Sequence, residues 1–112
     1  MRLYHNPRCS KSRQGLAILE SSGKEFQTIK YLEENIDAKE LKSIVEKLGI
    51  SPIELVRKNE TIWKSEFKGK DLSDSEVIEA MINNPKLIER PIVVNKEKAV
   101  VGRPPELILK II

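Results

Sequence analysis

The sequence predicts an α/β fold, a mixed four-stranded sheet flanked by helices, with a helical insertion in the middle of the chain. Two observations lead to this prediction. Short apolar or alternating segments, typical of strands, lie near both ends, and helical periodicity fills the region between them. The length of 112 residues suits a single domain over residues 1–112.

The beginning of the chain predicts a β-α-β unit. Residues 3–5 form a short apolar run that Asn6-Pro7 ends, so a strand enters a turn there. A helical pattern runs from Ser10 to Gly23, where glycine is a common C-terminal residue. Residues 26–31 alternate apolar and polar side chains, as a half-buried strand does. A unit of about 30 residues is the size of one right-handed parallel crossover.

The middle of the chain predicts three helices. Asp37 can cap the first, whose apolar residues recur at i, i+3, i+4 and i+7. Pro52 suits the first turn of the second helix. Ser73 with Glu76 makes a capping box that opens the third. We expect these helices over residues 37–49, 51–57 and 73–84.

The end of the chain predicts a hairpin and a last helix. Residues 92–94 and 99–101 are β-branched runs joined by the polar residues 95–98. Pro104-Pro105 then starts a helix that reaches residue 111. The order β-α-β, helices, β-β-α is that of a thioredoxin-like fold.

Composition and charge argue against several classes of protein. The 20 basic and 17 acidic residues are interspersed and leave a net charge of +3, unlike the basic stretches of nucleic-acid binders. No stretch reaches the roughly 18–20 apolar residues of a membrane span, and the N-terminus turns polar too soon for a signal peptide. With one cysteine and one histidine, a metal site of these residues is not expected. We therefore expect a cytoplasmic monomer that binds neither membrane nor nucleic acid.

Cys9 stands where the first strand gives way to the first helix. Unpaired N–H groups and the helix dipole favour an anion there, and the thiolate is the nucleophilic form of cysteine. Arg8, Lys11 and Arg13 add positive charge nearby. His5 could hydrogen-bond toward the sulfur and help to hold it ionised. These features predict that Cys9 is a nucleophile.

Each of these residues also has an ordinary structural explanation. A free cysteine is often a small buried hydrophobe, and a histidine at a strand end often only packs or faces solvent. Ser10 and Ser12 could each cap the helix, and we expect that one of them does. If Cys9 performs redox chemistry, its resolving sulfur must come from another molecule, because the chain has no second cysteine.

The stretch from His5 to Arg13 resembles the His-Asn-Pro-x-Cys-x-x-Ser-Arg signature of glutaredoxin-linked arsenate reductases. Residues 55–59, 89–94 and 101–106 continue the resemblance in the same order. Together the four blocks extend over nearly the whole chain. Jointly they are specific, whereas Cys-x-x-Ser alone is a weak signal.

The resemblance implies an enzyme of thioredoxin-like fold in which the cysteine attacks arsenate. Glutathione and glutaredoxin then supply electrons, and arsenite leaves; no cofactor is bound. Cys9 would be the nucleophile, His5 would keep it ionised, and Ser12 would lie near the thiolate. The peptide bond before Pro91 would be cis, and Pro91 would pack near the cysteine.

The same resemblance implies an oxyanion site made of arginines. A tetrahedral oxyanion needs several charge-assisted donors, and guanidinium groups supply them better than ammonium groups. The matching blocks assign this role to Arg57, Arg90 and Arg103, and Arg13 is a further candidate because it follows Cys9 closely.

Two other functions remain open at this point. Spx-type regulators share the fold and bind RNA polymerase, but their redox-switching members usually carry Cys-x-x-Cys, where this chain has Ser12. A general glutathione-dependent thiol reductase needs the same activated thiol as an arsenate reductase. Retention of polymerase subunits, or activity on a glutathionylated peptide without activity on arsenate, would distinguish these alternatives.

Overall fold

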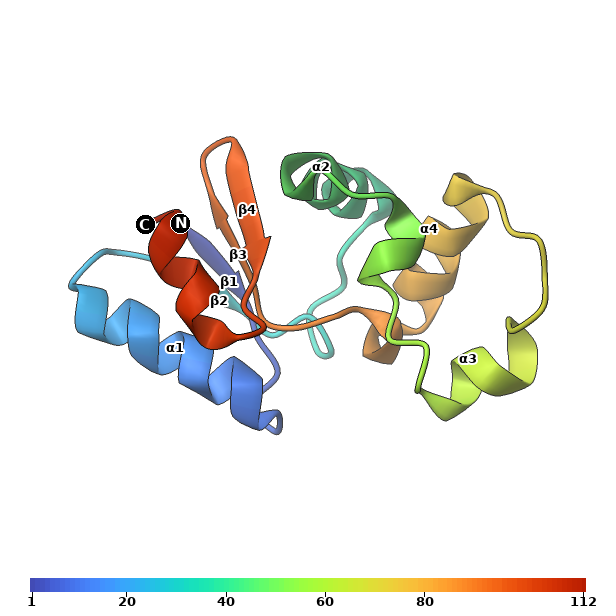
Figure 1. Ribbon diagram of the computed structural model, residues 1–112, viewed down its shortest axis with the longest axis horizontal. Helices are drawn as coiled ribbons and strands as arrows, with labels where there is room; N and C mark the ends of the chain where they lie inside the picture. Colours follow the sequence, from blue (N-terminus) through green and yellow to red (C-terminus); the bar gives the residue numbers. More distant parts are fainter. The chain divides into compact units, whose positions relative to one another are not determined.

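The computed structural model describes residues 1–112, which fall into two compact units. The first unit joins the two ends of the chain, Met1–Glu34 and Arg90–Ile112, and the second is the middle, Asn35–Glu89. Figure 1 shows the strands in the first unit and helices alone in the second. The helical insertion expected from the sequence is therefore a compact unit of its own.

The first unit contains a four-stranded mixed sheet, as predicted. The strand order is β2-β1-β3-β4; β1 runs parallel to β2 and antiparallel to β3, and β3 pairs with β4 as a hairpin. The two central strands thus come from opposite ends of the chain. The elements of this unit are β1 (Arg2–Tyr4), α1 (Ser10–Ser22), β2 (Gln27–Ile29), β3 (Ile92–Asn95), β4 (Lys98–Val101) and the 3-10 helix η3 (Pro105–Lys110).

The core of the first unit lies between this sheet and two helices. Leu3 of β1 and Val93 of β3 are register partners, and both are fully buried against Leu19 of α1 and Ile108 of η3. In Figure 1, α1 and η3 lie side by side, and the two helices contact each other. They therefore cover the same face of the sheet.

The second unit is helical, and backbone contacts join its middle to its C-terminal end. Val56 forms an isolated bridge with Ile88, and Arg57 N–H donates to the carbonyl of Leu87 at 2.7 Å. The long helices start at good caps, since Asp37 accepts from Glu40 N–H and Ser73 from Glu76 N–H. The elements are α2 (Ala38–Leu48), η1 (Pro52–Leu55), α3 (Thr61–Glu66), α4 (Asp74–Asn83) and η2 (Pro85–Leu87).

The structure differs from the sequence-based expectations in three places. The hairpin connection has two residues rather than four, because Lys96 takes a positive φ of 57° that a tight turn needs. The short proline-led helices after Ser51 and Pro104 are 3-10 rather than α. The helix α3 was not predicted, and its six residues are too few to show a clear period.

None of the helices combines the length and the apolar character that a bilayer span requires.

Two glycines allow α1 to approach the start of β3 closely. A Cβ built on Gly15 would lie 2.9 Å from Cγ of Pro91 and 3.0 Å from Cδ1 of Ile108. A Cβ on Gly102 would meet the same two side chains at 3.0 Å each. Pro91 and Ile108 thus fill the space that side chains would need at these positions, and this packing fixes α1 against the ends of β3 and β4.

We expect Gly15→Ala to lower the free energy of unfolding by up to about 2 kcal/mol. Alanine gains about 1 kcal/mol over glycine inside a helix, but overpacking against a rigid proline ring costs about 1–3 kcal/mol. Chemical denaturation measures the difference, with Gln14→Ala on the exposed face of the same helix as the control. A Gly15→Ala protein more stable than wild type would contradict the packing argument.

Candidate active site around Cys9

Cys9 ends a tight turn that joins β1 to α1. The Cys9 N–H donates to the carbonyl of Asn6 at 3.0 Å, and the Arg8 N–H donates to Oδ1 of Asn6 at 3.0 Å. Pro7 occupies the second position of this turn, for which its fixed φ is suited, and asparagine is favoured at the first. The dipeptide Asn6-Pro7 therefore sets where the strand stops and where Cys9 lies.

Cys9 is the N-cap residue of α1, with extended backbone angles of φ −96° and ψ 125°. Its side chain makes no capping hydrogen bond, in contrast to the caps Asp37 of α2 and Ser73 of α4. The first turn of α1 also contains no acidic residue. The unsatisfied N–H groups of this helix start thus remain available to a thiolate or an oxyanion.

The expectation that Ser10 or Ser12 caps the helix is wrong. Ser10 is the first helical residue and is exposed, and Ser12 lies fully buried in the first turn. The hydroxyl of Ser12 instead forms hydrogen bonds with two residues that follow β1, and sequence spacing alone does not reveal these bonds.

Ser12 joins His5 and Asn6 in a small buried hydrogen-bond network. Nδ1 of His5 lies 2.6 Å from Oγ of Ser12, and the Asn6 N–H donates to the same oxygen at 2.9 Å. The exposed fractions of His5, Asn6 and Ser12 are 4%, 7% and 0%. The ring of His5 makes this bond with Ser12 rather than one with the sulfur of Cys9.

The surroundings of His5 favour the neutral form of its ring. Burial lowers the pKa of His5 below its ordinary value of 6.5, the charge of Lys30 lowers it further, the hydrogen bond with Ser12 opposes the shift, and Arg13 adds a smaller lowering. A neutral ring can accept the hydroxyl proton of Ser12 at Nδ1, while the hydroxyl oxygen accepts from Asn6 N–H. An influence of His5 on Cys9 stays a prediction.

Arg103 brings a guanidinium group to the sulfur. Its Nη2 lies 3.6 Å from Sγ of Cys9, and its Nε donates to the carbonyl of Arg90 at 2.8 Å. The Arg90–Pro91 peptide bond is cis, as the resemblance implied, and the Arg103–Pro104 bond is cis as well. One arginine thus links Cys9 to the cis-proline segment, and its charge favours an anion at the sulfur.

Arg90 contributes a hydrogen-bond donor that no protein group uses. Its Nε is buried and has no partner. A buried N–H without an acceptor costs free energy, so such a group is either strained or reserved for an external acceptor.

The two remaining arginines of the predicted site have partners of other kinds. Nη1 of Arg13 donates to the carbonyl of Pro7 at 3.0 Å on the exposed side of the turn. Arg57 belongs to the second unit, where it pairs with Glu60 at 2.9 Å and with Glu89 at 3.0 Å. Oxyanion binding by Arg13 and Arg57 stays a prediction.

Three residues that build this region escaped the sequence-based list of site residues: Asn6, Gly15 and Gly102. The sequence Asn6-Pro7 predicted a turn. The hydrogen bonds of Asn6 to Arg8, Cys9 and Ser12 show that Asn6 also holds the turn against α1. The two glycines carried no local signal, because the neighbours that exclude a Cβ are distant in sequence.

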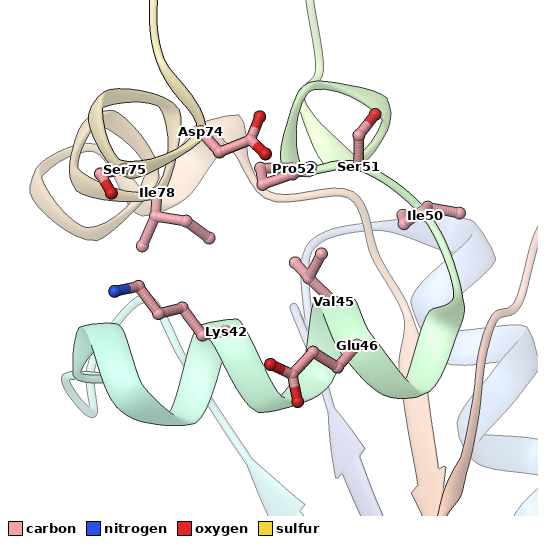
Figure 2. Close-up of a pocket in the computed structure, with 9 residues that line it drawn as sticks. All are labelled: Lys42, Val45, Glu46, Ile50, Ser51, Pro52, Asp74, Ser75 and Ile78. Atoms are coloured by element: carbon pink, nitrogen blue, oxygen red, sulfur yellow. The ribbon is translucent and has the colours of Figure 1, made fainter.

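The second unit contains a separate cavity of about 490 Å³ between α2 and α4 (Figure 2). Val45 of α2 and Ile78 of α4 supply apolar walls, and Lys42 and Asp74 stand at its rim. None of the predicted site residues lines it. No group of three or more His, Cys, Asp or Glu side chains is placed to hold a metal ion.

The buried, neutral His5 predicts a specific dependence of stability on pH. In the unfolded chain the imidazole takes a proton as the pH falls below about 6.5, whereas the folded protein resists that proton until a lower pH. The free energy of unfolding should therefore fall between pH 7.5 and 5.5, with a slope of at most about 1.4 kcal/mol per pH unit.

This slope is measured by urea denaturation in a Cys9→Ser background, in which no thiol titrates. The chain has one histidine, so adding His5→Gln should flatten the curve over the same range. Equal slopes with and without His5 would show that its pKa is not depressed in the folded state.

Comparison with known proteins shows the family to which this chain belongs. The sequence model of the ArsC family matches residues 4–111. The chain is 44% identical over 112 residues to an arsenate reductase of Haemophilus influenzae, covering 98% of this chain and 97% of that protein. It is 46% identical over 114 residues to the uncharacterized protein YfgD of Escherichia coli K12, covering 100% of this chain and 96% of that one. A solved arsenate reductase from Vibrio cholerae matches with a TM-score of 0.94 and 46% identity, covering 100% of this chain and 98% of that chain. The chain therefore belongs to the ArsC family.

Proposed function

We propose that this protein reduces arsenate to arsenite through a covalent adduct on Cys9, with glutathione and glutaredoxin as electron donors. The observation that carries the proposal is the setting of Cys9, whose sulfur lies at the uncapped N-terminus of α1 and 3.6 Å from Nη2 of Arg103. Relatives that cover nearly the whole chain bear the name arsenate reductase.

The proposed reaction begins with attack of the Cys9 thiolate on arsenic. A sulfur–arsenic bond forms and one arsenate oxygen leaves as water after protonation. The thiol of glutathione then displaces a second oxygen as water and binds arsenic through its own sulfur. No change of oxidation state has occurred at this stage, because each step exchanges an oxygen ligand for a sulfur ligand.

Reduction follows when a glutaredoxin thiolate attacks the sulfur of the bound glutathione. The arsenic–glutathione bond breaks, its electron pair stays on arsenic, and As(V) becomes As(III). The two external thiols leave as a mixed disulfide, which accounts for both electrons. Water then displaces the Cys9 sulfur and arsenite is released. The chain supplies a single cysteine, so both reducing thiols must come from outside it.

The groups around Cys9 suit a tetrahedral oxyanion. The first-turn N–H groups of α1 can donate to its oxygens, and the guanidinium of Arg103 can contact both the sulfur and an oxygen bound to it. The buried Nε of Arg90 has no hydrogen-bond partner, and we propose that it also donates to the anion. We propose additional roles for Arg13 and Arg57 in binding the anion.

We further propose that the protein acts as a monomer in the cytoplasm. Reduced glutathione is abundant there, and such a reducing compartment keeps a free catalytic thiol reduced. Among its large apolar side chains only Leu32 and Leu109 are exposed, which supports a monomer.

The first test is arsenate reduction by wild type and by Cys9→Ser with glutathione and glutaredoxin supplied. Wild type should consume NADPH through the coupled glutathione system on addition of arsenate, and Cys9→Ser should be inactive because a serine hydroxyl stays protonated. Gln14→Ala, exposed on the same helix, should retain activity. No turnover by wild type at millimolar arsenate, or equal turnover by Cys9→Ser, would refute the proposal.

Omitting glutathione and glutaredoxin in turn tests which electron donors the protein uses. Activity should require both glutathione and glutaredoxin. If wild type instead reduces a glutathionylated peptide and leaves arsenate unchanged, the protein is a general thiol reductase.

A second test concerns Arg103. We expect Arg103→Ala to lower kcat/KM for arsenate by about 10- to 100-fold, since a hydrogen bond to a charged group contributes about 1.5–3 kcal/mol. Arg103→Lys should recover only part of this loss, because an ammonium group cannot bridge the Arg90 carbonyl and the sulfur at once. Lys110→Ala, which removes an exposed positive charge from η3, is the matched control. Equal losses in the Arg103→Ala and Lys110→Ala proteins would mean that only net charge matters.

A further inference from the structure

We propose that Asn6 is the positioning residue of the nucleophile: it fixes the Cys9 turn so that the anion meets only the N–H groups of α1. The inference deepens the proposed function, on which its catalytic meaning rests. It needs no contact between Asn6 and the substrate.

Asn6 uses three of its polar groups on the segment around Cys9. Its carbonyl accepts from the N–H of Cys9 and its Oδ1 accepts from the N–H of Arg8, both at 3.0 Å. Its own N–H donates to Oγ of Ser12 at 2.9 Å. Asn6 is only 7% exposed, so these bonds are largely shielded from water. A single residue thus joins the end of β1, the turn and the first turn of α1.

These bonds occupy every backbone N–H group from Asn6 to Cys9. Pro7 has no N–H, and the N–H groups of Arg8 and Cys9 both point to Asn6. An anion at the sulfur is therefore left with the N–H groups that follow Cys9, which are those aligned with the axis of α1. Without the Oδ1 acceptor, the Arg8 peptide is free to rotate, and the extended N-cap conformation of Cys9 loses one of its supports.

The chemistry of the side chain predicts how substitutions at this position rank. The serine side chain is shorter than that of asparagine, and its oxygen supports the same kind of turn more weakly; alanine has no side-chain acceptor. Asn6→Ser should therefore keep part of the Cys9 reactivity that Asn6→Ala loses. Asparagine also accepts the Arg8 N–H without placing a negative charge beside the thiolate, as an aspartate would.

The experiment uses Cys9 itself as the probe. Iodoacetamide alkylates only Cys9, since the chain has no other cysteine. The second-order rate is measured at pH 7 and at pH 9.5 for wild type, Asn6→Ala, Asn6→Ser and the control Gln14→Ala. Circular dichroism and a melting curve accompany each variant.

At pH 7 we expect Asn6→Ala to react about threefold to tenfold more slowly than wild type, because the thiolate loses its alignment with the helix start. At pH 9.5, where thiols ionise without help, its rate should match that of wild type. Asn6→Ser should lie between the two at pH 7, and Gln14→Ala should equal wild type at both pH values. If Asn6→Ala does not fold, Asn6→Ser alone carries the comparison, with a rate below wild type at pH 7 and equal to it at pH 9.5.

Two results would overturn the proposal. Equal rates at pH 7 would show that Asn6 does not affect the thiolate. An equal loss at both pH values, together with a lower melting temperature, would show a role in stability alone. Alkylation requires no arsenate, so these outcomes stand even if wild type fails to reduce arsenate. The two hypotheses therefore fail separately.

Discussion

The N-terminus of α1 imposes the main electrostatic constraint on this region. A helix start leaves N–H groups without acceptors, and proteins normally satisfy them with a side-chain cap and an acidic first turn. The second unit does both at α2 and at α4. At α1 the cap position holds Cys9, whose sulfur accepts no hydrogen bond from the helix, and the first turn has no carboxylate. The positive potential of this helix start can therefore act on the negative charge of a thiolate or of a bound anion.

Close packing holds the other parts of the site around that helix start. Gly15 of α1 and Gly102 after β4 leave room for Pro91 and Ile108, and a Cβ at either glycine would come within 3.0 Å of both side chains. The Gly102 N–H also donates to the carbonyl of Pro91 at 2.8 Å. Because α1 and the ends of β3 and β4 are held at this separation, Arg103 reaches Cys9 with Nη2 while its Nε holds the Arg90 carbonyl.

Local signals were enough to predict the mixed sheet, most of its strands and the long helices. Caps such as Asp37 and Ser73, and the glycines that end α1 and α2, act over a few residues and can be read directly. The place of Cys9 at a helix start was predictable for the same reason. The partners of its neighbours were not. Ser12 was expected to cap α1, but its hydroxyl forms buried hydrogen bonds with His5 and Asn6, and these depend on the tertiary structure. Arg57 was assigned to an anion by resemblance, and its two carboxylate partners, Glu60 and Glu89, depend on how the second unit closes.

The two central strands of the sheet come from opposite ends of the chain, and so do the sulfur and its guanidinium partner, 94 positions apart. During synthesis on the ribosome, Cys9 leaves the exit tunnel long before Arg103 does. β1 is paired on both edges only after β3 has been made. Closing so long a loop costs conformational entropy, which the contacts of the completed sheet offset. A nascent or truncated chain therefore carries the cysteine without its charged neighbour. Cys9 gains its guanidinium partner only after Arg103 has been made.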